Sequence, residues 1–379
     1  MVGTPRRILI APDKFKGSLT AAEAAEAMAE GVLTVYPDAS VARVPVADGG
    51  EGTMEAAVAA GFEERASNVI GPLSKPVRAA WALRGTTALI ETAQASGLAV
   101  LGGEATPETA SRAHSYGTGQ LIAQALDAGA TELILGLGGS AMTDGGSGAM
   151  HALGVKPLDA AGNLVPLGGA FLGDVVAVDA SGLDPRLASA RIRIAVDVRN
   201  PLYGMDGAAF IFGPQKGADP DTVEKLDAAL RTWAGALLHA TGRDVNVLGA
   251  GAAGGFPASF LAFTSANLES GFEMVAQLVG LDRELAAADL VLTGEGSLDG
   301  QSLKGKAPIA LADQARQRGI PVVAVAGRIL ATPEELAEHG IEAAAALVDL
   351  AASPAEAMAH GAAYVRRAVV QLMHSGREK

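Results

Sequence analysis

Short, largely apolar runs alternate along the chain with segments of helical spacing, and glycine-rich loops join many of them. Residues 7–11, 133–137 and 289–293 are such runs and predict buried strands. The first run leads through a loop into a predicted helix over residues 20–36, where Thr20 and Glu23 have the spacing of a capping box. This order of strand, loop and helix predicts an α/β fold.

The two ends of the chain share this pattern. After residues 289–293 come predicted strands at 321–326 and 343–348, and helices separate and follow them up to residue 373. A β-α-β-α-β-α order is typical of a doubly wound sheet, and the first strand and helix of the chain continue it. We therefore expect one discontinuous doubly wound domain made of residues 1–70 and 290–379.

The residues between these ends, 71–289, are expected to form an inserted mixed α/β domain. Prolines, glycines and short β-like runs over residues 62–101 predict antiparallel strands and turns, and they indicate a domain boundary nearby. Residues 208–212 predict another short strand. Residues 249–256 contain too much glycine for either a helix or a strand.

Composition narrows the class of protein. The chain has 379 residues, a formal net charge of −13, no cysteine and six histidines. That charge argues against nucleic acid and anionic membranes as partners, and no apolar run approaches the length that crosses a bilayer. The apolar stretch near the N-terminus is too short for a signal peptide. These features predict a cytoplasmic enzyme without a structural zinc site.

Residues 138–148 hold the densest candidate site. A buried strand ends in glycines, and a predicted helix follows, so backbone amides could surround an oxyanion. Ser140 and Thr143 add hydroxyl groups, and Asp144 adds a carboxylate. A carboxylate beside a phosphate site is explained by a metal ion or a substrate hydroxyl between them. A tight turn capped by Asp144 explains the same residues equally well.

Four further glycine-bearing junctions carry acids or lysines, at residues 12–18, 47–53, 213–217 and 293–306. Their charged residues include Asp13, Lys14 and Lys16; Asp48 and Glu51; Lys216; and Glu295 and Asp299. A solvated loop or a helix cap would explain each junction separately. Turns require glycine, Asn or Asp but not repeated acids together with lysines, so the set favours a functional role.

Several carboxylates, lysines and free amides suit phosphoryl transfer. Mg²⁺ binds carboxylate and phosphate oxygens, while lysines and amides stabilise the charge of the transferred group. Asp197 and Arg199 follow another predicted strand, and the Arg199 guanidinium could bind a carboxylate bidentately, although a surface ion pair is equally plausible. Neither a P-loop nor the protein-kinase motifs are present. The residues thus predict a phosphate- or nucleotide-handling α/β enzyme.

Six blocks closely resemble the type-1 glycerate kinase family and occur in that family's order. They are Ala-Pro-Asp-Lys-Phe-Lys-Gly-Ser at 11–18, Asp-Gly-Gly-Glu-Gly-Thr at 48–53, Gly-Gly-Ser-Ala-Met-Thr-Asp-Gly-Gly at 138–146, Asp-Val-Arg-Asn-Pro-Leu at 197–202, Gly-Pro-Gln-Lys-Gly at 213–217 and Thr-Gly-Glu-Gly at 293–296. The resemblance implies ATP- and Mg²⁺-dependent phosphorylation of D-glycerate, with 2-phosphoglycerate as product. It also implies a flavodoxin-like domain made from both chain ends, an inserted α/β domain, and a site in the cleft between them.

Within that resemblance, each site residue receives a hypothetical role. Asp197 is the first choice for the general base, because an alcohol needs a carboxylate to accept its proton. Asp48 and Asp144 are rivals for this role, and either could instead hold Mg²⁺. Arg199 would bind the glycerate carboxylate and Lys14 would neutralise charge. The expected further substrate contacts are Asp13 and Ser18, and the expected ATP contacts are Gly138, Gly139, Ser140, Thr143, Gly145, Lys216 and Glu295.

Other functions remain open on the sequence. A hydroxyacid dehydrogenase would need a G-x-G-x-x-G loop after the first strand, which residues 12–18 lack. A noncatalytic sensor of sugar acids or nucleotides could use the same residues, and phosphorylation at the 3-hydroxyl is a further alternative. The oligomeric state, monomer or homodimer, and the metabolic pathway also stay undecided.

Overall fold

The computed structural model describes residues 5–50, 52–300 and 302–375, and its contacts divide into two compact units. The first unit combines three segments of the described chain: residues 5–48, residues 55–60, and the part from residue 272 to residue 375. The second unit contains residues 49–54 and 61–271. The protein is therefore a two-domain α/β protein in which both units are discontinuous in sequence, because residues 55–60 of the first unit interrupt the second.

The first unit is built on a five-stranded parallel sheet with the order β13-β12-β11-β1-β2. Ile8 aligns with Leu290 across β1 and β11, so the two ends of the chain form one sheet, as the repeated pattern predicts. The strands are β1 (Arg7–Ile10), β2 (Ser40–Arg43), β11 (Leu290–Leu298), β12 (Val322–Ile329) and β13 (Ile341–Ala346).

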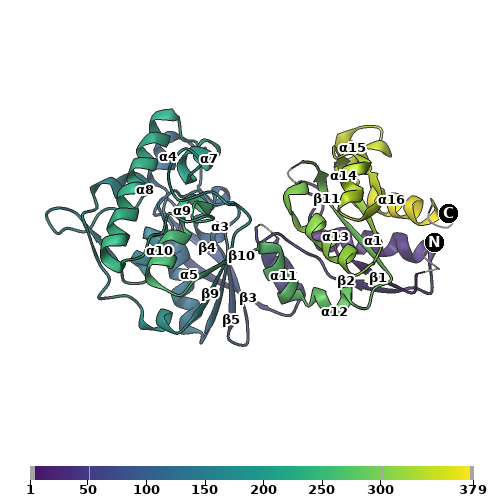
Figure 1. Ribbon diagram of the computed structural model, residues 1–379, viewed down its shortest axis with the longest axis horizontal. Coiled ribbons are helices and arrows are strands. Elements are labelled where there is room, and N and C mark those ends of the chain that lie inside the picture. Colours follow the sequence, from purple (N-terminus) through teal and green to yellow (C-terminus); the bar gives the residue numbers. More distant parts are fainter. Residues whose placement is uncertain (1–4, 51, 301, 376–379) are drawn as a thin grey trace. The chain divides into compact units, whose positions relative to one another are not determined.

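Both faces of this sheet are buried, which explains its continuous apolar strands. Ile8 and Ile10 pack in one core with α1 (Ala21–Val35) and α16 (Gly361–Ser375), whereas Leu9 packs in a second core with α13 (Ala307–Gln317) (Figure 1). The remaining helices are α12 (Leu281–Leu285), α14 (Pro333–Glu338) and α15 (Pro354–Ala359). The chain changes unit within α2 (Thr53–Ala59) and at the start of α11 (Gly271–Val279).

The order of the strands reverses between β1 and β11. From β1 the chain continues to β2 on one side, while β11, β12 and β13 follow one another on the other side. Loops at the carboxyl ends of β1 and β11 therefore diverge, and such a switch point leaves a crevice in which open α/β sheets bind ligands.

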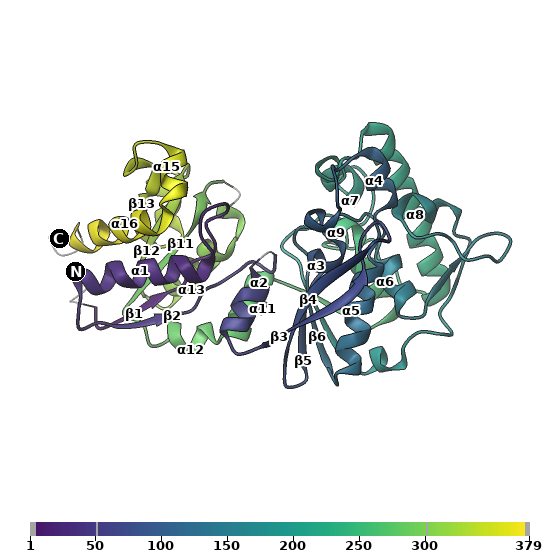
Figure 2. The same cartoon turned by 180° about the vertical axis from the view of Figure 1, so that it is seen from behind.

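The second unit contains a six-stranded mixed sheet with the order β10-β9-β6-β5-β4-β3 (Figure 2). β4 is antiparallel to both of its neighbours, β3 and β5, as the composition of residues 62–101 predicts, whereas β5, β6, β9 and β10 pair in parallel. The strands are β3 (Glu63–Ile70), β4 (Pro76–Arg84), β5 (Thr87–Glu91), β6 (Glu132–Gly136), β9 (Arg191–Ala195) and β10 (Asn267–Glu269), with a separate pair β7 (Lys156–Leu158) and β8 (Ala177–Asp179).

The contacts do not divide at the expected residues 70 and 290. β3 pairs with β4 over its whole length, from Glu63 opposite Leu83 to Ile70 opposite Pro76, because a short turn joins the two strands. Residues 63–70 thus belong to the second sheet. At the other boundary, Phe272, Leu281 and Leu285 are buried in a core of the first unit.

The expected strand at residues 208–212 is wrong, because this segment is the helix α7 (Ala208–Phe212). A run of five apolar residues has no decisive periodicity, and here Ala208 and Ala209 are buried in the core that includes Leu226 and Leu230 of α8 (Pro220–Thr241). The other helices of the unit are α3 (Thr92–Ser96), α4 (Pro107–Arg112), α5 (Tyr116–Asp127), α6 (Ser147–Ala152), α9 (Ala252–Gly255) and α10 (Pro257–Phe263).

The glycine-rich stretch 249–256 was expected to form neither a helix nor a strand, but the short helix α9 occupies residues 252–255. Its short α9 contains Ala253 and Gly254 in the left-handed region, with φ values of 48° and 69°. In the described ranges, no helix combines the length and the apolar character that crossing a membrane requires.

Candidate active site

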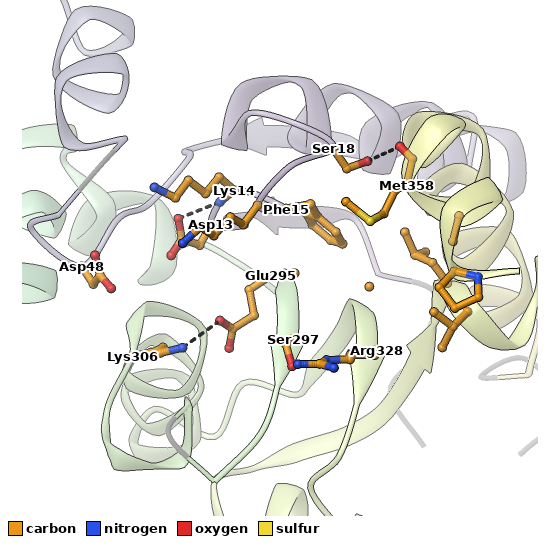
Figure 3. A pocket seen from close by; sticks show the side chains of 17 residues that line it. Asp13, Lys14, Phe15, Ser18, Asp48, Glu295, Ser297, Lys306, Arg328 and Met358 are labelled. Carbon is orange, nitrogen blue, oxygen red and sulfur yellow. Dashed lines mark hydrogen bonds and ion pairs between the residues drawn. The ribbon is translucent and has the colours of Figure 1, made fainter. Parts of the chain in front are cut away.

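A pocket of ≈ 590 Å³ lies in the first unit, at the carboxyl ends of the strands beside the switch point (Figure 3). It is lined mainly by the loop after β1, the ends of β11 and β12, and residues after β13. Six residues singled out in the sequence line it together: Asp13, Lys14, Lys16, Ser18, Asp48 and Glu295. Glu51, from the same block as Asp48, lies outside the described residues.

Asp13 is held by an extension of the sheet. Its backbone N–H donates to the Gly294 carbonyl at 2.8 Å, which continues the pairing of β1 with β11 past the end of β1. Its carboxylate accepts a hydrogen bond from the Lys14 backbone N–H, and the residue is 8% exposed. Burial, and then the nearby Asp48 carboxylate, raise the Asp13 pKa to about 7. A carboxyl group in this range can gain or lose a proton near neutral pH.

Glu295 is the second buried carboxylate of the pocket. It lies on β11 with 6% exposure, and its Oε1 atom has no hydrogen-bond partner among the described residues. The Lys306 ammonium is 4.0 Å from the other oxygen, Oε2. Burial raises the Glu295 pKa. A buried oxygen without a partner is costly unless a ligand satisfies it, so Glu295 indicates a binding position.

Ser18 closes the loop against the C-terminal part of the unit. Its Oγ donates a 2.7 Å hydrogen bond to the Met358 carbonyl. This hydrogen bond joins the β1 loop, with its acids and lysines, to α15. Ser18 therefore has a structural partner beside its place in the pocket wall.

Sequence reasoning assigned no role to several further residues that line this pocket, among them Ser297, Lys306, Arg328 and Met358. Arg328 follows Gly327 on β12, and its Nε donates to the Ser297 hydroxyl at 3.1 Å. A basic residue directly after glycine was a signal that could have identified Arg328, near the end of β12, and Lys306, which immediately precedes α13. Met358 lies within a short helix and had no such signal.

The second unit holds the 138–148 loop, and most of it is buried. Gly138 is half-buried and Gly139 exposed, while Ser140, Thr143 and Asp144 are at most 7% exposed. The Gly145 carbonyl accepts hydrogen bonds from the Ser259 hydroxyl and the Trp233 indole, and its N–H donates to Gly254. The loop is thus tied to the interior, with Gly138 and Gly139 at its accessible end.

Asp144 is fully buried and fits the capping alternative. Its Oδ2 accepts hydrogen bonds from the Ser115 backbone N–H and hydroxyl at 2.7 and 2.8 Å and from the Gly148 N–H, and its Oδ1 accepts one from the Gly146 N–H. These donors occupy both oxygens, so the geometry does not suit Asp144 as a ligand of Mg²⁺.

Lys216 also points into the protein. It is 3% exposed, and its Nζ donates a 2.6 Å hydrogen bond to the Met142 carbonyl within the same loop. Burial lowers the Lys216 pKa to about 7, and the Asp144 carboxylate opposes part of this shift. The lysine therefore supports the 138–148 loop from below.

Asp197 and Arg199 follow β9 and are both exposed. The Asp197 Oδ1 accepts a 3.0 Å hydrogen bond from the Gly271 N–H, which holds the carboxylate at the strand end. Both side chains are accessible to a ligand, as a general base and a carboxylate-binding arginine would require.

The first unit is a parallel α/β sheet with a pocket at its switch point, and this pocket contains carboxylates and lysines. These features are typical of an α/β enzyme that binds charged ligands. A sequence model described as the glycerate kinase family matches residues 8–376. The chain belongs to this family.

Individual relatives agree with the family. The glycerate 2-kinase of Escherichia coli K12 is 46% identical over 341 residues, covering 89% of each chain. The glycerate kinase of Bacillus subtilis 168 is 42% identical over 367 residues, covering 95% of each chain. A crystal structure from Salmonella typhimurium LT2, described as a putative glycerate kinase 2, is similar with a TM-score of 0.85, 41% identity and 98% coverage of both chains. These similarities identify the protein as a kinase.

Proposed function

We propose that this enzyme transfers the γ-phosphoryl group of ATP to the 2-hydroxyl of D-glycerate in the presence of Mg²⁺. The observation that carries the proposal is the pocket in which Asp13, Asp48 and Glu295 lie with Lys14 and Lys306. Acids of this kind bind a divalent cation, and lysines stabilise phosphate charge. Phosphorylation at the 2-position is proposed by analogy with the Escherichia coli relative, a glycerate 2-kinase.

The donor set of the pocket fits Mg²⁺ bound together with phosphates. Mg²⁺ is usually held by one or two carboxylates, waters and substrate phosphates rather than by a cage of protein ligands. The described residues contain no group of three or more His, Cys, Asp or Glu side chains arranged for a metal. Glu295, with its unpartnered Oε1, and Asp48 would hold the ion. When bound, Mg²⁺ neutralises charge on the phosphates.

Two carboxylates are candidates for the general base. Asp197 stays our first choice, because it is exposed at a strand end and one of its oxygens is oriented by the Gly271 N–H. Asp13 is the second candidate, because burial and Asp48 raise its pKa to about 7, close to the pH at which a base works best. Arg199 would bind the glycerate carboxylate through its planar guanidinium.

The phosphate contacts are proposed at two places. Lys14 and Lys306 line the pocket, and the Gly138 and Gly139 amides lie at the accessible end of their loop. Ser140, Thr143, Gly145 and Lys216 would act by holding that loop in shape, because they are buried. We keep the cytoplasm as the expected location, where ATP is abundant.

The test is a reaction of the purified chain with ATP, Mg²⁺ and D-glycerate. We expect ADP release that depends on all three, and NMR of the product should show the phosphate on carbon 2. L-Glycerate and omission of Mg²⁺ serve as controls. A product phosphorylated on carbon 3 would contradict the assigned position. Absence of ADP release with every three-carbon acid would favour a sensor.

A further inference from the structure

The pocket of the first unit has two chemically different ends. Asp13, Asp48 and Glu295 gather at one end, whereas Met358 lies at the other (Figure 3). The wall near Met358 is apolar and comes from the turn after β13 and from α15; its members are Leu347, Val348, Pro354 and Ala357.

We propose that this apolar end binds the nucleobase of the nucleoside triphosphate, with the phosphates directed toward the carboxylates and lysines. The inference rests on the proposed function only for the identity of the ligand as the phosphoryl donor. It assigns Met358 and the turn at Leu347 and Val348 a role in nucleotide affinity.

The size of the pocket supports a ligand larger than glycerate. At ≈ 590 Å³ the pocket lies within the range of about 300–1,000 Å³ that is typical of sites for drug-sized ligands. A three-carbon acid would leave most of this volume empty. Glycerate also has no apolar group that could pack against the apolar wall around Val348 and Met358. A nucleotide has both a flat apolar ring system and a polyanionic tail.

Met358 is chemically suited to contact such a ring. The side chain is 52% exposed although it is large and apolar. Methionine is flexible and polarizable, and its thioether makes favourable contacts with aromatic rings. A nucleobase lying against Met358 and Val348 would remove this apolar surface from water.

The two ends of the pocket are fixed relative to each other within the unit. The Ser18 hydroxyl donates to the Met358 carbonyl at 2.7 Å, which ties the loop bearing Asp13 and Lys14 to α15. At Gly17 a Cβ would lie only 3.0 Å from the Met358 Cε, so glycine at this position leaves room for the Met358 side chain at the edge of the pocket. Arg328, hydrogen-bonded to Ser297, lines the same pocket and supplies a guanidinium for the phosphate chain.

The experiment compares Met358→Asp with Leu330→Asp. Both side chains are exposed apolar residues of the first unit, but Leu330 does not line the pocket. A carboxylate at position 358 would meet both the apolar base and the nearby anionic tail. We expect the KM for ATP to rise about tenfold or more, with the KM for glycerate and the melting temperature unchanged. Leu330→Asp should change none of these.

Binding of ADP, measured by calorimetry without glycerate, separates this inference from the proposed function. Weaker ADP binding by Met358→Asp supports the nucleobase position even if no glycerate is phosphorylated. Unchanged ADP binding by Met358→Asp would overturn the inference while leaving the kinase activity intact. A rise in the KM for glycerate alone would also overturn it, because the pocket would then hold the acid.

Discussion

The Nζ atom of Lys216 donates a 2.6 Å hydrogen bond to the main-chain oxygen of Met142. The lysine of the Gly-Pro-Gln-Lys-Gly block thus points toward the interior of its unit, where it is 3% exposed. At Gly217, which has a φ of +92°, a Cβ would lie 2.3 Å from the Ala105 carbonyl carbon, so the block needs glycine at this close approach. The block therefore positions a buried amine under the 138–148 loop.

The buried amine predicts a pH-dependent stability. The Lys216 pKa falls from 10.5 to about 7 on folding, so between these values the unfolded chain binds a proton that the native protein lacks. Stability of the unsubstituted protein relative to Lys216→Met should therefore rise with pH across this window, by at most about 1.4 kcal/mol per pH unit. Urea unfolding at pH 7, 8 and 9 measures the slope. If the free energies of unfolding of the two proteins change with pH in parallel, Lys216 is charged in both the folded and the unfolded state.

Asp144 is predicted to be structural. In Asp144→Asn, an amide NH₂ replaces one carboxylate oxygen and faces N–H or O–H donors from Ser115, Gly146 or Gly148. We expect a loss of about 3 kcal/mol or more in the free energy of unfolding, measured by denaturant titration. Asp159→Asn, at an exposed turn, is the matched control and should cost much less. A stability loss in Asp144→Asn that excess Mg²⁺ restores would point back to a metal ligand.

Gly49 is predicted to be a packing glycine. Its φ is +83°, and a Cβ would lie 2.6 Å from the Ala195 Cβ. Gly61 has a similar φ of +91° but no atom within 4 Å of the added Cβ. Gly61→Ala should cost about 1 kcal/mol through backbone strain alone, and Gly49→Ala about 1–3 kcal/mol more through the clash. Equal melting temperatures for the two variants would show that the backbone yields at Gly49.

Asp13 should give the opposite pH dependence to Lys216. Its pKa rises from 3.8 to about 7 on folding, so between these values the native protein binds a proton that the unfolded chain lacks. Without ligands, stability relative to Asp13→Asn should fall as the pH rises from 4 to 7, by a few kcal/mol in total at about 1.4 kcal/mol per pKa unit. Thermal unfolding in EDTA measures this difference. A difference independent of pH would mean that Asp13 is charged throughout.

Asp197→Asn separates the two candidate bases. If Asp197 accepts the glycerate proton, its loss should lower kcat by about 10²–10⁴-fold while ATP binding stays largely intact. Steady-state kinetics and ADP calorimetry measure the two quantities. Near-normal turnover would remove Asp197 from the role. If only Asp13→Asn lowers kcat, the general base is Asp13, which lies in the pocket.

Much of the architecture could be predicted from local patterns. Residues such as Ile8, Leu9 and Ile10 are buried on both faces of the sheet, so their apolar run identifies a central strand directly. Thr20 and Glu23 lie at the start of α1 and form the capping box that their spacing predicts. Glycine and proline between these segments predict turns for steric reasons that act within a few residues.

Local sequence patterns did not predict which charged side chains are buried. Lys14 is next to a phenylalanine and Lys216 is next to a glycine, and both lie in polar loops. In the structure, Lys14 lines a pocket, whereas Lys216 is buried under the 138–148 loop. Asp48 likewise lines the pocket, whereas Asp144 is buried and accepts hydrogen bonds within its unit. Burial depends on which distant segment covers a residue, and no local spacing encodes that segment.

The sequence by itself determined the alternation of strands and helices, the joining of both chain ends in one sheet, and the acids and lysines at the strand ends, because apolar periodicity and turn chemistry are local. Tertiary structure alone decided which of those charged groups share a pocket. Thr293 bonds the Ala11 carbonyl across 282 positions, and contacts of that range bring Glu295 beside Asp13 and add Met358 to the same wall. They arise only when the parallel strands pair, since each strand's carboxyl end then opens onto one edge of the sheet.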